Sequence, residues 1–142
     1  MKESFIIAKL LSTYLYDTYH IRISAKQILS IGKDYTLPDD IYEYVKLGYE
    51  WLEKVYKKLI IFDGAHTSDK VISEIMQVLK EEGTFEDGHY TPNNPEQTVL
   101  AVIDHAGLLI PANGRTKKGE IDECANKLVV VRNKTDLSVL FI

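Results

Sequence analysis

Three short apolar runs, separated by segments of helical periodicity, constrain the fold of this 142-residue chain more than any other feature. The runs occupy residues 59–62, 98–103 and 137–142. Continuous apolar runs of this length are typical of strands that are buried on both faces, as in parallel sheets. Helical segments between such strands supply the crossover connections that parallel pairing requires. The sequence therefore predicts an α/β fold in which a short parallel sheet is flanked by helices.

Helices are predicted before, between and after these runs. Apolar residues recur at helical spacing in residues 4–19, 36–57, 68–83 and 121–128. Ser24 and Gln27 have the spacing of a capping box, which predicts a short helix that ends near Gly32. Thr36 and Ser68 are the expected caps of the two longer helices that follow. Residues 83–97 are rich in glycine, proline and asparagine, so we expect a long surface loop there.

Composition excludes several classes of protein. With 45% hydrophobic residues the chain can bury a core, which excludes a disordered protein. No apolar run approaches the roughly 18 residues of a membrane span. A single cysteine, Cys124, allows no internal disulfide and indicates an intracellular, cytoplasmic protein. The net charge of −4 means that any contact with nucleic acid has to come from a local basic patch.

An aspartate follows the second apolar run directly, at Asp104. A buried parallel strand that ends in aspartate resembles a Walker B strand, which brings a carboxylate to the ligand edge of the sheet, where it can hold Mg²⁺. Asp63 follows the first run in the same way, so a site with two carboxylates is one interpretation. The alternative is that each aspartate only stabilises the turn after its strand.

Further polar residues lie near the same predicted edge. Arg115, Lys117 and Lys118 stand in a polar loop, where they could bind a phosphate backbone or simply be solvated. His66 and His105 follow the strand-ending aspartates, although histidines in turns usually lie on the surface. Cys124 lies on an apolar helical stripe and is expected to be a buried, inert thiol. The sequence contains no glycine-rich loop that ends in Gly-Lys-Ser/Thr.

The order of these features resembles the C-terminal, RecA-like motor domain of DnaB-type replicative helicases, including phage versions. The resemblance is most specific at residues 103–109, Ile-Asp-His-Ala-Gly-Leu-Leu, where the family has its Walker B aspartate followed by an aromatic residue or histidine and an apolar pair. It continues in a basic loop, then Glu120-Ile121 at the start of a helix, and then the run at 137–142. The earlier helices and the run at 59–63 occupy matching places, so the resemblance spans nearly the whole chain.

The resemblance implies a partial RecA-like fold of the P-loop NTPase type, in one incomplete motor domain that spans residues 1–142. Asp104 would position Mg²⁺ at the ATP phosphates, and His105 would stand beside it. Arg115, Lys117 and Lys118 would face single-stranded DNA in the channel of a hexamer, in a bacterial or phage-infected cell. The family's phosphate-binding loop and catalytic glutamate would precede Met1, and its glutamine sensor would follow Ile142. We therefore expect the middle part of a DNA helicase motor that does not hydrolyse ATP alone.

Two other functions remain open from the sequence. The chain could be a non-catalytic α/β interaction module, which completes its sheet with a partner or dimerises through an exposed edge strand. It could also be a small Mg²⁺-dependent phosphotransfer or nuclease domain that uses Asp63 and Asp104 together.

Overall fold

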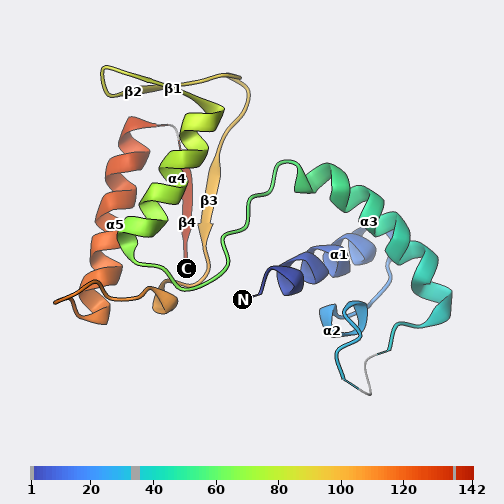
Figure 1. Cartoon of the computed structure of the whole chain (residues 1–142). Coiled ribbons are helices and arrows are strands. Elements are labelled where there is room, and N and C mark those ends of the chain that lie inside the picture. Colours follow the sequence, from blue (N-terminus) through green and yellow to red (C-terminus); the bar gives the residue numbers. More distant parts are fainter. Residues whose placement is uncertain (1, 33–35, 136) are drawn as a thin grey trace. The chain divides into compact units, whose positions relative to one another are not determined.

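The computed structural model describes residues 2–32, 36–135 and 137–142, which form a mixed α/β structure. The chain divides into two compact units, Met1–Gly64 and Ala65–Ile142, called here the first and the second unit (Figure 1). Each unit has its own hydrophobic core. In the part of the chain that is described, no helix has the length and apolar character needed to cross a membrane.

The first unit is helical. It contains α1 (Glu3–Tyr19), α2 (Ala25–Ile28), the 3-10 helix η1 (Asp39–Ile41) and α3 (Tyr42–Tyr56). Leu15, Ile23 and Val45 form the centre of its core. Gly48 allows α3 to approach α1, because a Cβ atom at this position would lie 3.1 Å from Leu11 Cδ2. The rings of Tyr14 and Trp51 stack between the same two helices at 4.3 Å.

The expected helix boundaries in this unit are confirmed in part. Ser24 and Gln27 form the predicted capping box. Gly32 has the predicted positive φ, although α2 already ends at Ile28. The prediction that Thr36 caps the third helix is wrong, because η1 precedes α3 and starts after Pro38. The three residues between Gly32 and Thr36 lie outside the described part of the chain.

The second unit consists of two helices, a hairpin and a parallel sheet. Its elements are α4 (Ser68–Glu82), β1 (Gly83–Glu86), β2 (His89–Pro92), β3 (Leu100–Ile103), the 3-10 helix η2 (Ala106–Leu108), α5 (Lys117–Lys134) and β4 (Ser138–Phe141). The strands β3 and β4 are parallel neighbours, with Leu100 opposite Ser138 and Ile103 opposite Phe141. The chain passes from one to the other through α5, so β3, α5 and β4 form a β–α–β unit (Figure 1).

The parallel sheet is covered on one face. Helices α4 and α5 pack against each other and enclose a core that includes Leu79, Cys124 and Leu128. Alternate residues of the two strands face this core, namely Ala101, Ile103, Val139 and Phe141. The side chains between them remain exposed, with Leu100 at 62%, Val102 at 53% and Leu140 at 50%. The sequence predicts a sheet that is buried on both faces, whereas one face of this sheet is exposed.

Two predicted elements are wrong. Residues 59–62 form no strand, and Ile60 and Phe62 are exposed, so the expected three-stranded parallel sheet has two strands among the described residues. Residues 83–92 are not a loop but the antiparallel hairpin of β1 and β2. Its turn consists of Asp87 and Gly88, which both have positive φ, as a tight hairpin turn requires.

Candidate functional site

The carboxyl ends of β3 and β4 lie at the same end of the second unit as the N-termini of α4 and α5 (Figure 1). This placement follows from the β–α–β connection, which brings the ends of parallel strands and the starts of their helices together. The Ala106 N–H donates to the Ile142 carbonyl at 2.6 Å, which ties the two strand ends to each other. The residues predicted to act on a ligand from β3, the basic loop and α5 are therefore near this edge.

Asp104 follows β3 directly, as the sequence predicts, and its side chain is exposed. His105 is also exposed, and its ring lies over Gly107, where a Cβ atom would come within 2.4 Å of Cε1. Within residues 2–32, 36–135 and 137–142, no group of three His, Cys, Asp or Glu side chains could hold a metal ion. One exposed carboxylate does not hold Mg²⁺ by itself, because this ion also needs ligands from substrate phosphates and water.

Asp63 belongs to the first unit and follows a segment that is not a strand. The interpretation that pairs it with Asp104 required two neighbouring strands to end at one edge. Among the described residues, β3 and β4 alone are paired in parallel, so the structure gives no support to a phosphotransfer or nuclease site with two carboxylates.

Of the three predicted DNA-binding cations, only Arg115 lies in the loop before α5, because Lys117 and Lys118 belong to the first turn of that helix. Two of the three cations are used internally. Arg115 Nη1 lies 3.3 Å from Glu120 Oε2, and Arg115 Nη2 lies 3.6 Å from Glu123 Oε1. Lys117 Nζ donates a hydrogen bond to the Leu109 carbonyl. Lys118 is exposed, and among the described residues it has neither a hydrogen bond nor an ion pair. Lys118, in the first turn of α5, is thus the most available of the three cations to a ligand.

Glu120 connects several segments at this end of the unit, a role that the sequence interpretation did not give it. Its side chain is fully buried and accepts hydrogen bonds from the Ser68 N–H at 2.6 Å and the Ala112 N–H at 3.1 Å, in addition to the Arg115 guanidinium. The Ser68 N–H is the largest cause that lowers its pKa, to about 2, and the Ala112 N–H lowers it further, while burial opposes them. A signal was present, because Glu120 stands four residues before Cys124 on the buried stripe of α5.

The other residues singled out in the sequence, His66 and Cys124, make contacts that stabilise the fold. His66 lies before α4, where its carbonyl accepts from the Ile110 N–H at 2.9 Å and its Nε2 lies 4.0 Å from Glu74 Oε1. Lys70 also pairs with Glu74, at 3.3 Å. Cys124 is fully buried, as predicted, and burial is the main cause that raises the pKa of its thiol. These residues tie α4 to the loop before α5 or fill the core.

No protein-family model, curated protein or solved structure matches this chain. Its function is therefore inferred from its own residues and their arrangement.

Proposed function

We propose that this chain is part of the motor domain of a DnaB-like replicative helicase, and that it contacts single-stranded DNA through the first turn of α5 and the loop before it. The observation that carries the proposal is the position of Asp104, which follows β3 at the end of the sheet where α5 and its basic loop begin. A carboxylate at this place is what a motor of this type needs beside the phosphates of a nucleotide. In the intact motor, Mg²⁺ and ATP would bind with further ligands from a Gly-Lys-Ser/Thr loop, which this sequence does not contain.

The open outer face of the sheet also supports the proposal. Parallel sheets almost always have both faces covered, and a two-stranded sheet is a small part of a typical one. Leu100 and Val102 are more than half exposed, and Leu140 is half exposed. In a motor domain, further strands and helices would cover these three side chains. The DNA contact is local, as the net charge of −4 requires. It uses Lys118 and the Nη2 group of Arg115, which is paired with Glu123 in the structure.

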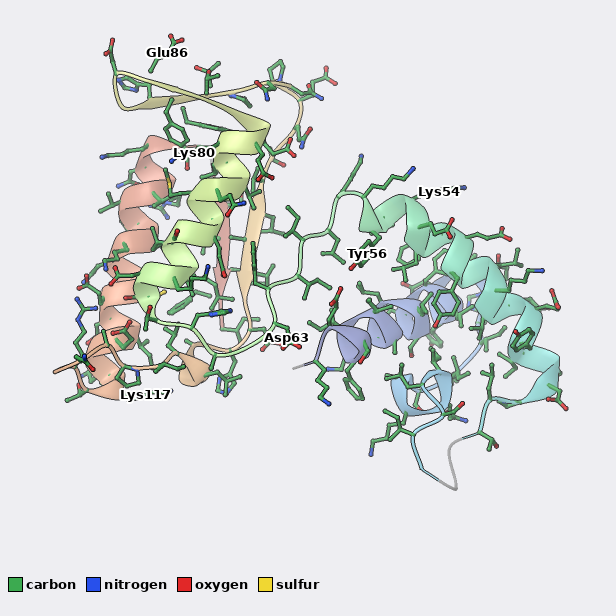
Figure 2. All side chains as sticks on the ribbon, in the orientation of Figure 1. Lys54, Tyr56, Asp63, Lys80, Glu86 and Lys117 are labelled. Atoms are coloured by element: carbon green, nitrogen blue, oxygen red, sulfur yellow. The ribbon has the colours of Figure 1, made fainter. Side chains whose placement is uncertain are left out.

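The test is binding of fluorescently labelled single-stranded DNA to the full chain at low salt. We expect binding that weakens with salt. We also expect Lys118→Glu to reduce the magnitude of the negative slope of log K against log salt by about 0.7, the value of one phosphate contact. Lys80→Glu is the matched control, because Lys80 is also an exposed lysine, in the last turn of α4. Figure 2 shows it at the opposite end of this unit from Lys117. Absence of DNA binding, or equal weakening by both substitutions, would contradict the proposal.

A second candidate function is an interaction module that associates with another copy of the chain through the sheet. The specific observation in its favour is the same outer face, which carries apolar side chains and no charged residue on β3 or β4. Such a face is self-complementary without charge repulsion, and its strand edges offer backbone groups for pairing.

A further inference from the structure

Three segments of the second unit meet at one carboxylate. Glu120 Oε1 accepts from the first N–H of α4, at Ser68, and Glu120 Oε2 accepts from the Ala112 N–H and from Arg115 Nη1. Glu120 itself belongs to the first turns of α5. The loop before α5 is thus held against the start of α4 by a side chain with no exposed surface.

The two carboxylates that pair with Arg115 differ in how well their charge would remain balanced if Arg115 moved. Glu120 is buried, and its charge is balanced by this guanidinium and two backbone N–H groups. Glu123 is partly exposed and is also paired with Lys127 at 3.0 Å. Removal of one partner from a buried charge is costly, whereas an exposed pair is worth little. The free-energy cost of breaking the Arg115–Glu123 pair is therefore small, and Arg115 can exchange Glu123 for another anion. Breaking the Arg115–Glu120 pair costs more.

We propose that Glu120 is a positioning residue for DNA binding, which fixes Arg115 through Nη1 while Nη2 moves from Glu123 to a DNA phosphate beside Lys118. This inference rests on the proposed DNA contact of the same loop. Lys127 keeps Glu123 paired after the exchange, and Asp69 stays bound to Lys127. A guanidinium held on one side is well suited to this role, because its planar fork presents the remaining N–H groups in a fixed direction.

The sign of the effect of Glu120→Gln separates positioning from simple charge. Loss of a negative charge near a DNA-binding loop should strengthen binding if Glu120 acts only through its charge. If Glu120 positions Arg115, the substitution should instead weaken binding and lower the salt slope by about 0.7, one phosphate contact. In an Arg115→Gln background the same substitution should then no longer weaken DNA binding. DNA affinity is measured below the unfolding temperature of each variant, as followed by circular dichroism.

A second substitution covers the case in which Glu120→Gln does not fold. Glu123→Gln should strengthen DNA binding by roughly 1.5- to 5-fold, the range of an exposed ion pair, and only when Arg115 is present. Glu86→Gln, at an exposed position of the hairpin far from the loop (Figure 2), is the matched control and should leave the affinity unchanged. Equal effects of Glu123→Gln and Glu86→Gln, or an effect that persists in Arg115→Gln, would overturn the inference.

The two proposals fail in different ways. If the unsubstituted chain does not bind single-stranded DNA, the proposed function fails and this inference fails with it. If the chain binds DNA through Lys118 but the effects of Arg115, Glu120 and Glu123 are simply additive, only the positioning role is wrong.

Discussion

Glu120 links the stability of the second unit to acid pH. Its pKa is about 2 in the folded chain, below the ordinary value of 4.5, because the Ser68 and Ala112 N–H groups stabilise its charged form. A carboxyl whose pKa is lowered by folding contributes stability above its unfolded pKa and loses it as pH falls. We expect this contribution to be complete above about pH 5 and to disappear between about pH 4.5 and 2.

The measurement is the urea midpoint of unfolding as a function of pH for the unsubstituted chain and for Glu120→Gln. The other carboxyl groups are common to both proteins, so the difference between the two curves isolates Glu120. That difference should be largest at neutral pH and should shrink below pH 4.5. Two parallel curves would show that the charge of Glu120 does not stabilise the fold.

At the scale of single residues, the sequence predicts the position of a side chain where that position depends on the neighbouring residues in the chain. Asp104 is found because it directly follows an apolar run, and Cys124 because it lies on a helical stripe. The role of Glu120 depends on Ser68, which is 52 residues away, and on the path of the loop through Ala112. Local patterns contain no information about such a partner. The partners of Arg115 and Lys117 are close in the sequence, but their pairing depends on the path of the loop, which the local pattern does not predict.

At the scale of elements, helix α5 shows how tertiary packing overrides local preference. Val129, Val130 and Val131 favour a strand, yet all three are helical, because Leu128 and Val131 fill the core between α4 and the sheet. We expect Leu128→Ala to lower the free energy of unfolding by about 2–5 kcal/mol, since it leaves a cavity. Val130→Ala should change it by less than about 0.7 kcal/mol, because Val130 is exposed and alanine is the better helix former.

Urea unfolding followed by circular dichroism checks this pair of substitutions. They shorten aliphatic side chains two positions apart on one helix, so the contrast between them reports burial rather than helix propensity. Similar losses for both would mean that α5 is held by its intrinsic preference and not by its packing.

The other elements were predictable to different degrees. The capping box of Ser24 and Gln27 is a local interaction and is confirmed. The hairpin was missed although Asp87-Gly88 is a strong turn signal between Phe85 and Tyr90, because the glycine and proline content of the segment was taken to indicate a loop. Residues 59–62 have the composition of a strand but form none, since a strand also needs a neighbour with which to pair.

At the scale of the whole molecule, the uncovered face of the sheet is what both candidate functions have to explain. Leu100, Val102 and Leu140 lie on one side of two paired strands, and water contacts all three. A helicase motor would cover them with further elements, and an interaction module would cover them with a second copy. In either case the chain on its own should associate through this face, because parallel sheets are rarely stable with one face in water.

We therefore expect the isolated chain to form dimers at micromolar concentration in sedimentation experiments, and Val102→Lys to make it monomeric. A lysine at this position would place a charge in the centre of the apolar contact, which is costly when no partner neutralises it. Val130→Lys is the matched control, because Val130 is exposed to a similar extent, 54% against 53%, but lies on α5. A chain that stays monomeric without any substitution would exclude self-association through the sheet and would contradict the expectation that the open face needs a cover.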